Sequence, residues 1–135
     1  MSKRIYITHC SAKKGDSLRI TDRKVTPDEL YSATPLQRFA KKCKEKSVEW
    51  AIFSDKYGVV FPWEEIEWYD KHPDKVTPDE FQSLVYNFIQ RLSKYDEVWF
   101  YHNPGRFHSL YKKLIEEVRN KGLNIDLFTH LSGIR

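Results

Sequence analysis

Strand-like and helix-like segments alternate along the chain, and this alternation restricts the fold more than any other feature of the sequence. The four segments that predict strands, because they are rich in β-branched and aromatic residues, are Arg4–His9, Glu49–Ser54, Glu97–His102 and Asn124–Thr129. Strands that alternate with helices form parallel sheets joined by right-handed crossovers, and the helices pack on the sheet faces. The pattern therefore predicts an α/β fold, a three-layer sandwich with a four-stranded, mainly parallel sheet and helices on both faces.

The segments between the predicted strands carry apolar residues at helical spacing, with one stripe in each segment. The three stripes comprise Leu36, Phe39, Ala40 and Cys43; Phe81, Leu84, Val85, Phe88, Ile89 and Leu92; and Phe107, Leu110, Tyr111, Leu114, Ile115 and Val118. Threonine followed by proline, with Gln or Glu three residues after the threonine, predicts capping boxes that begin at Thr34 and Thr77. Asn103 and Pro104 are expected to cap the last of these helices.

The length and composition indicate one domain in a reducing compartment. A chain of 135 residues suits a single α/β domain that spans residues 1–135. No apolar run approaches the roughly 20 residues of a membrane span, and no signal peptide precedes the first predicted strand. Two cysteines, Cys10 and Cys43, are too few for a disulfide framework. These observations predict a cytoplasmic protein with no membrane partner.

Positive charge is concentrated in the first third of the chain. Residues 1–46 hold 12 Lys and Arg against 5 Asp and Glu, whereas residues 47–135 hold 11 against 14. A basic segment favours a polyanionic partner such as nucleic acid or a nucleotide. The alternative is that the basic residues of the first helical segment only keep the protein soluble.

Polar residues follow each predicted strand, and a parallel sheet would bring them to one edge. They are His9, Cys10, Ser11, Lys13 and Lys14 after the first strand; Ser54, Asp55, Lys56, Tyr57 and Gly58 after the second; His102, Asn103, Gly105 and Arg106 after the third; and His130 after the fourth. Open parallel sheets bind ligands beyond the carboxyl ends of their strands. We therefore expect a ligand site at this edge, although polar residues also end strands by chance.

Cys10 and Asp55 are the sharpest candidates for chemistry at this edge. A thiol beside two lysines could act as a nucleophile, and the histidines available as its base are His9, His102 and His130. Cys10 could equally be a small residue buried at a strand end. Asp55 could accept a proton or bind an amide or ribose hydroxyl. The alternative for Asp55 is an ordinary salt bridge with a neighbouring lysine.

The run from Asn103 to Arg106 predicts an anion site, because free backbone N–H groups at a helix start bind anions. Arg106 and Lys13 would add charge for a phosphate or a carboxylate, whereas ordinary capping by Asn103 is the alternative. The chain has no Cys-x-x-Cys, no His-Glu-x-x-His and no glycine-rich nucleotide fingerprint. No metal site and no cofactor are therefore predicted.

Aromatic and acidic side chains are mixed in residues 61–70, which hold four of each. Aromatic side chains on a loop stack on nucleobases, whereas the acids would repel a phosphate backbone. The segment would then be a flap over a base or a small ligand. Alternatively, it folds back over the core, since aromatic side chains prefer burial.

Four short runs together resemble a domain family of unknown function. The runs are Thr8-His9-Cys10-Ser11-Ala12-Lys13-Lys14, Leu30-Tyr31-Ser32, residues 50–60 and Tyr69-Asp70. Their layout is similar to the core domain of archaeosine synthase, a tRNA-modifying enzyme that acts on a 7-deazaguanine base, and that domain resembles the uracil-DNA glycosylase fold. By position, the resemblance implies site roles for Cys10, Lys13, Tyr31, Ser32, Asp55, Lys56, Tyr57, Gly58, Tyr69 and Asp70.

These observations predict a domain that binds a nucleobase, nucleoside or nucleotide at the carboxyl edge of its sheet. It could be an enzyme of base modification or glycosyl-bond chemistry, with tRNA or DNA as the larger partner. We expect Lys13 and Arg106 to hold an anion, and Tyr57 or Tyr69 to stack on the base. We expect Cys10, Asp55 and His102 to carry out the chemistry. The alternatives are a non-enzymatic nucleic-acid-binding or adaptor module and a small hydrolase that uses Cys10. The oligomeric state is left open.

Overall fold

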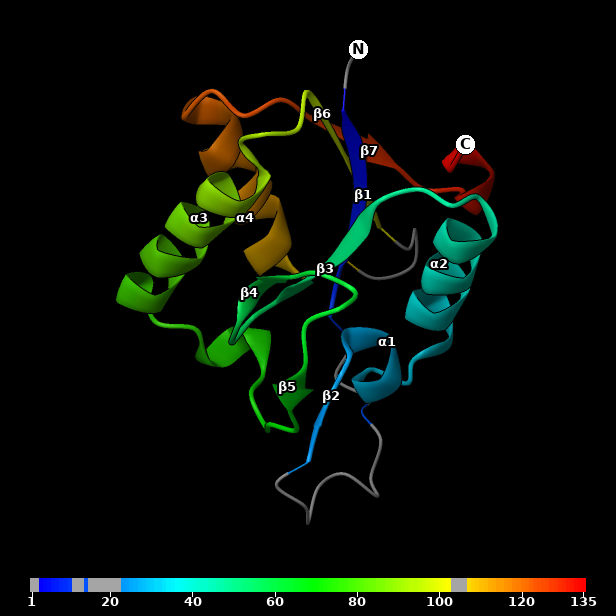
Figure 1. The fold of residues 1–135 in the computed structure, drawn as a ribbon. Coiled ribbons are helices and arrows are strands. Elements are labelled where there is room, and N and C mark those ends of the chain that lie inside the picture. Colours follow the sequence, from blue (N-terminus) through cyan, green and yellow to red (C-terminus); the bar gives the residue numbers. More distant parts are fainter. Residues whose placement is uncertain (1–2, 11–13, 15–22, 103–106) are drawn as a thin grey trace.

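The computed structural model describes residues 3–10, 14, 23–102 and 107–135 of the chain. Its centre is the parallel strand β1 (Arg4–His9), which lies between β3 (Trp50–Ser54) and β6 (Glu97–Tyr101). The main sheet has five strands in the order β4-β3-β1-β6-β7, and the last of them is β7 (Ile125–Phe128). Figure 1 shows β1 running through the middle of the molecule, away from the amino terminus.

All four predicted strands form, and they are mutually parallel, as expected from the alternation of strands and helices. The expected count of four strands is wrong, because the sheet has a fifth strand, β4 (Gly58–Val60), antiparallel to β3. β4 follows a tight turn at residues 55–57 and is only three residues long, too short to show a periodic pattern. Gly58 permits this turn: its φ is +77°, and a Cβ there would lie 2.3 Å from Oδ1 of Asn87.

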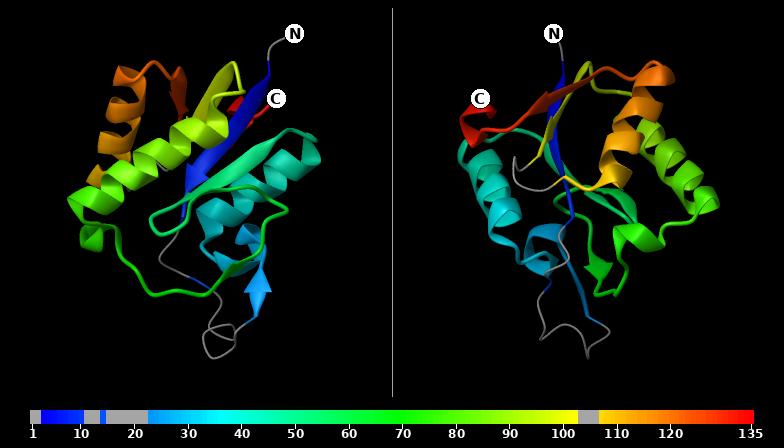
Figure 2. Two further views of the ribbon diagram at one scale, coloured as in Figure 1. Left: turned by 60° about the vertical axis from the view of Figure 1, so that its left-hand side comes forward. Right: turned by 180° about the vertical axis from the view of Figure 1, so that it is seen from behind.

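Helices pack against both faces of the sheet (Figure 2). The helix α2 (Thr34–Glu45) packs on the face that carries Tyr6 and Cys10. The helices α3 (Pro78–Leu92) and α4 (Ser109–Asn120) pack on the face that carries Ile5 and Ile7. Alternate residues of β1 thus enter two separate apolar cores, because successive side chains of a strand point to opposite faces.

The predicted apolar stripes face these cores, but only one of the predicted helix starts is correct in detail. The capping box at Thr77 forms, with reciprocal bonds between Thr77 and Glu80. The box at Thr34 does not form, because Thr34 already lies inside α2, and the Gln37 side chain donates to the backbone carbonyls of Asp28 and Tyr31 instead. The cap expected from Asn103 is also wrong. α4 begins at Ser109, where Nδ1 of His108 accepts the backbone N–H of Leu110.

The two long connections that leave β1 and β3 meet at the carboxyl end of the sheet. The short strand β2 (Lys24–Val25) of one connection pairs with β5 (Ile66–Glu67) of the other, and α1 (Pro27–Leu30) follows β2 directly. Figure 1 shows all three elements at the end of the molecule opposite the amino terminus. Short 3-10 turns lie at Pro73–Lys75, before α3, and at Leu131–Gly133, after β7.

The segment of residues 61–70 largely folds back over the core. Phe61, Ile66 and Tyr69 are buried, whereas Trp63 is 68% exposed and stacks on Phe61 with a ring separation of 5.0 Å. The prediction that this segment is a flap over a ligand stays a prediction.

None of the helices formed by the described residues is long and apolar enough to cross a bilayer.

Candidate functional site

The topology places a switch point beside β1. The chain leaves β1 and enters β3 on one side, and it leaves β6 and enters β7 on the other side. The strand ends are held by backbone bonds: the N–H of Cys10 donates to the carbonyl of Phe53 at 2.8 Å, and the N–H of His102 donates to the carbonyl of Phe128 at 3.1 Å. Open parallel sheets bind ligands where neighbouring connections diverge in this way.

A buried carboxylate lies at the carboxyl end of β3. Asp55 is 2% exposed, and its oxygen Oδ1 accepts a hydrogen bond from the Tyr69 hydroxyl at 3.0 Å and a weaker one from the Cys10 thiol at 3.6 Å. Both donors are neutral and both reach the same oxygen. In the part of the chain that the structure describes, no residue donates to the second oxygen, Oδ2. The alternative interpretation of Asp55, an ordinary salt bridge with a neighbouring lysine, is not seen among the described residues.

The Tyr69 hydroxyl is the centre of the hydrogen-bond network around this carboxylate. It lies 2.6 Å from the Tyr31 hydroxyl and 3.0 Å from Oγ of Ser54. Because Tyr69 donates its only proton to Asp55, Tyr31 and Ser54 must donate to Tyr69. Oγ of Ser54 in turn accepts the backbone N–H groups of Lys56 and Tyr57. The whole chain of bonds therefore points its protons toward Asp55.

Burial keeps the Cys10 thiol and the tyrosine hydroxyls around Asp55 protonated. It raises the pKa of the Cys10 thiol to about 11, and the nearby Asp55 charge raises it further. Burial also raises the pKa of the Tyr31, Tyr69 and Tyr111 hydroxyls, with the Cys10 thiol as the next cause. At neutral pH Cys10 is therefore a thiol that donates a hydrogen bond, and thiolate attack would require a change in its surroundings.

Two lysines approach the aromatic rings of the network. Nζ of Lys14 lies 4.4 Å from the centre of the Tyr69 ring, and Lys14 is only 9% exposed. Nζ of Lys56 lies 5.6 Å from the same ring and 5.2 Å from the ring of Tyr57. Tyr57 packs edge-on against Tyr69, and its hydroxyl donates to the carbonyl of Glu67 in β5. Of the two predicted stacking residues, Tyr69 is buried in the core and Tyr57 is half-buried.

Two histidines lie on the α4 side of the strand ends. His9 stacks on Tyr111 with ring centres 4.5 Å apart, and His102 stacks on Phe107 at 4.6 Å. Nδ1 of His9 is 2.8 Å from the carbonyl of Cys10, so it carries a proton and leaves Nε2 as an acceptor in the neutral ring. Burial lowers the pKa of His9. Nδ1 of His102 is buried and has no hydrogen-bond partner among the described residues.

The remaining predicted site residues contribute less to this geometry. Ser32 follows Tyr31 and is half-buried, whereas Asp70 and His130 are exposed. Gly58 is buried within β4 and packs against Asn87. Ser11, Lys13, Asn103, Gly105 and Arg106 lie outside the described residues, so their predicted roles stay predictions.

Tyr111 belongs to the network and was not predicted there. Its hydroxyl lies 3.5 Å from the sulfur of Cys10, although the residue comes from α4 on the opposite face. The sequence places Tyr111 in an apolar helical stripe, and this position predicts a core residue. The signal that could have identified it is that a buried tyrosine hydroxyl needs a polar partner.

Among the described residues, no group of three His, Cys, Asp or Glu side chains could hold a metal ion.

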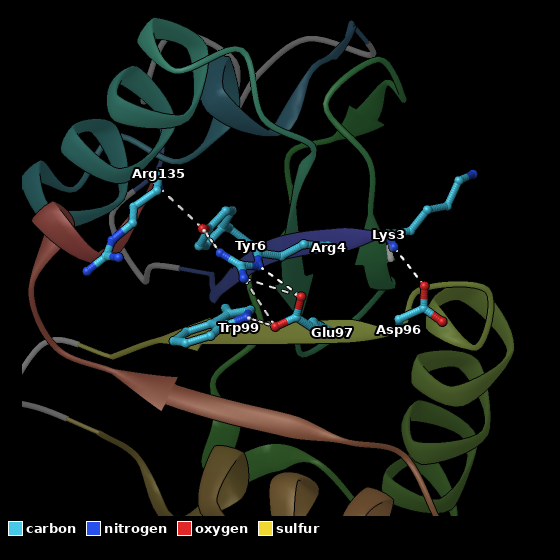
Figure 3. Close-up of polar contacts among 7 residues, drawn as sticks. All are labelled: Lys3, Arg4, Tyr6, Asp96, Glu97, Trp99 and Arg135. Carbon is cyan, nitrogen blue, oxygen red and sulfur yellow. Dashed lines mark hydrogen bonds and ion pairs between the residues drawn. The ribbon is translucent and has the colours of Figure 1, made fainter. Parts of the chain in front are cut away.

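A second polar cluster lies at the opposite, amino end of β1 (Figure 3). Arg4 pairs with both carboxylate oxygens of Glu97 at 3.2 Å and 3.3 Å and lies 5.0 Å over the ring of Trp99. The Tyr6 hydroxyl accepts from Nη1 of Arg4 at 3.1 Å and from the backbone N–H of Arg135 at 3.3 Å. We refer to these five residues as the amino-end cluster. It fastens the end of the chain to the central strand.

Comparison with known proteins gives one match. Neither the curated proteins nor the solved structures contain a match to this sequence. Residues 5–129 match a family described as "Family of unknown function (DUF6884)", which agrees with the predicted resemblance to a domain family of unknown function. The matched residues include the five strands of the main sheet, apart from Arg4 at the start of β1, and the network around Asp55. The chain therefore belongs to the DUF6884 family, whose function is unknown.

Proposed function

We propose that this protein binds a nucleobase, nucleoside or nucleotide at the carboxyl end of its sheet, and that Asp55 recognises the base. The observation that carries the proposal is the buried Asp55 carboxylate, which neutral donors reach at one oxygen only. A buried carboxylate costs free energy unless its hydrogen bonds are complete. A ligand N–H group that donates to Oδ2 would complete them.

The surroundings of the carboxylate suit the amide and amino edges of a nucleobase. Tyr69 and Cys10 donate to Oδ1 and thereby hold the carboxylate in one orientation. Tyr57, two residues after Asp55, offers a partly exposed aromatic surface, and base stacking on such a ring contributes roughly 1–3 kcal/mol. Charged acceptors discriminate strongly between ligands with and without a matching N–H group.

The same arrangement supports an enzyme of base modification or glycosyl-bond chemistry. In this proposal Asp55 accepts a proton or stabilises positive charge, and His102 handles a second proton with the buried Nδ1 that lacks a partner among the described residues. Cys10 takes part as a hydrogen-bond donor to Asp55, since its thiol is protonated at neutral pH. We also propose that the three-layer fold is similar to the core domain of archaeosine synthase. The substrate in this proposal is tRNA or DNA.

The proposal is tested by titration calorimetry with the four common ribonucleosides, the four deoxynucleosides, 7-deazaguanine and unmodified tRNA. We expect at least one base to bind, and Asp55→Asn to weaken that binding by about 10–100-fold, as expected for loss of a hydrogen bond to a charged group. Glu97→Gln is the matched control, because it removes the carboxylate of the amino-end cluster, and it should leave the affinity unchanged. Absence of binding by every ligand, or equal affinity of the wild type and Asp55→Asn, would refute the proposal.

A second candidate is a nucleic-acid-binding or adaptor module without catalysis. It is supported by three exposed basic residues, Arg38 and Lys41 on α2 and Lys46 directly after this helix. Binding through these residues would weaken steeply as salt rises, because it releases counterions from the nucleic acid. A triple substitution to glutamine should then reduce binding to duplex DNA and tRNA alike, whereas binding that does not depend on salt would contradict this function.

A further inference from the structure

We infer that Asn87 of α3 is a positioning residue of the candidate site and holds the turn of residues 55–57 in place through β4. This inference rests on the proposed function, since the turn carries Asp55, the residue proposed to recognise the base. The juxtaposition behind it is an asparagine side chain of α3 that accepts a backbone N–H group of β4 and fills the space beside Gly58.

β4 lies at the edge of the main sheet, where it pairs with β3. In an antiparallel pair, alternate N–H groups point away from the neighbouring strand and need another acceptor. Val59 provides such a group: it is 1% exposed, and its N–H donates to Oδ1 of Asn87 at 2.8 Å. Because an unpaired buried N–H group is costly, Asn87 supplies an acceptor that the sheet itself does not.

The backbone at Gly58 is matched to Asn87. A Cβ at Gly58 would lie 2.3 Å from Oδ1 of Asn87, so glycine lets the helix approach the strand this closely. Gly58 also pairs with Ser54 of β3, and this pair closes the turn between the two strands. The residue that ends the turn therefore lies directly against Asn87.

The helix α3 gives Asn87 a firm support. Phe88, the next residue, is fully buried and packs edge-on against Phe53 of β3, with ring centres 5.7 Å apart. Asparagine favours a helix interior less than alanine or leucine does, so the helix itself gains nothing from Asn87. α3 thus holds β3 through Phe88 and β4 through Asn87.

The turn is also held from the side of β3. Oγ of Ser54, which is fully buried, accepts the backbone N–H groups of Lys56 at 3.1 Å and Tyr57 at 3.0 Å. Ser54 fixes the start of the turn, and Asn87 fixes the strand that follows it. Loss of the Asn87 bond should therefore loosen the turn and the orientation of Asp55, although it removes no group proposed to contact the ligand.

Hydrogen exchange measured by NMR tests the hold on the turn without any ligand. In Asn87→Ala, the amide protons of Lys56 and Tyr57 should exchange about three- to tenfold faster, as expected for the loss of one hydrogen bond. Asn87→Asp should restore the wild-type rates, because a carboxylate oxygen also accepts the N–H group. If Asn87→Ala does not fold, Asn87→Leu should give the same increase, because leucine has no acceptor. Unchanged exchange at Lys56 and Tyr57 would overturn the inference, whichever ligands bind.

The affinity for the base that binds best in the panel tests the consequence for the site. Asn87→Ala should weaken this binding by about three- to tenfold, and Asn87→Asp should keep the wild-type affinity. Tyr6→Phe is the control, because it removes a buried hydroxyl of the amino-end cluster, at the opposite end of the sheet, and should leave the affinity unchanged.

The outcomes separate this inference from the proposed function. If a base binds and Asn87→Ala leaves its affinity unchanged, or if Tyr6→Phe weakens binding equally, Asn87 is not a positioning residue and the proposed function stands. If no base binds the wild type, the proposed function is refuted. Faster exchange at Lys56 and Tyr57 in Asn87→Ala would then still support the hold of Asn87 on the turn.

Discussion

The two ends of β1 carry polar clusters of opposite character on the same face of the sheet. At the amino end, Arg4 forms a two-pronged ion pair with Glu97, and 36% and 29% of these side chains remain exposed. At the carboxyl end, Asp55 is 2% exposed and accepts hydrogen bonds from a phenol and a thiol. Cys10 lies six residues after Arg4, which corresponds to about 20 Å along a strand.

The difference between the two ends indicates which cluster suits stability and which suits the proposed ligand site. The ion pair at the amino end keeps part of its hydration and matches each charge, so its net contribution to stability is small and favourable. A buried carboxylate with neutral donors loses its hydration without an equivalent return, which makes it a poor device for stability. Groups of this kind persist at sites where a ligand or a reaction needs them.

Replacing the central tyrosine of the carboxyl-end network should have the largest effect on stability. Tyr69→Phe removes the hydroxyl that bonds Tyr31, Ser54 and Asp55, and it leaves three buried polar groups each one partner short. We expect a loss of about 3 kcal/mol in the free energy of unfolding, because each unsatisfied buried group costs about 1–3 kcal/mol. Urea denaturation followed by tryptophan fluorescence measures this loss.

The matched substitution at the amino end is Tyr6→Phe. Tyr6 is as deeply buried as Tyr69, but its two donors keep other partners: Arg4 retains Glu97, and Arg135 is exposed. The expected loss is about 1 kcal/mol. Equal losses of unfolding free energy in Tyr69→Phe and Tyr6→Phe would contradict the difference between the two clusters.

Alkaline pH should weaken the carboxyl end next, through the Cys10 thiol. A free thiol has a pKa near 9, and burial raises the pKa of Cys10 to about 11 in the folded protein. The unfolded chain loses the thiol proton at a lower pH than the folded chain does. Burial of the neutral Cys10 thiol therefore contributes fully to stability below pH 9, and this contribution is lost as the pH rises toward 11. The loss should reach roughly 2 kcal/mol at pH 11.

The contribution of Cys10 is isolated by comparing the pH dependence of stability in the wild type and in Cys10→Ser. Serine keeps a donor to Asp55 but does not titrate in this range. We expect a shallower decline for the variant between pH 9 and 11. Identical slopes for the two proteins would show that the thiol is not shielded as the structure indicates.

The smallest effect is expected for the ion pair at the amino end. Glu97→Gln should lower the free energy of unfolding by about 0.5 kcal/mol, because partly exposed pairs retain water and are screened by salt. A double-mutant cycle with Arg4→Gln, measured at low and high salt, gives the coupling energy directly. A salt-independent coupling energy above about 2 kcal/mol would show that the amino-end cluster contributes as much to stability as the network around Asp55.

Sequence patterns anticipated the framework of the site. The strand ends at Cys10, Asp55 and His102 could be assigned to one edge, since parallel strands joined by crossovers share their direction. The fifth strand, β4, escaped detection because three residues carry no measurable period. The start of α4 was misplaced because Asn103-Pro104 resembles a cap, whereas His108 supplies the cap bond.

What the sequence by itself determined is the alternation of elements, the apolar face of each helix and the edge at which polar residues gather, because these follow from local periodicity. Only the tertiary structure decided which side chains meet Asp55. Tyr31 comes from the end of α1, Tyr69 from the segment after β5 and Tyr111 from α4, and no spacing in the chain relates them. Their convergence depends on how three separate connections pack at one end of the sheet, and that packing buries the carboxylate and keeps the thiol of Cys10 protonated.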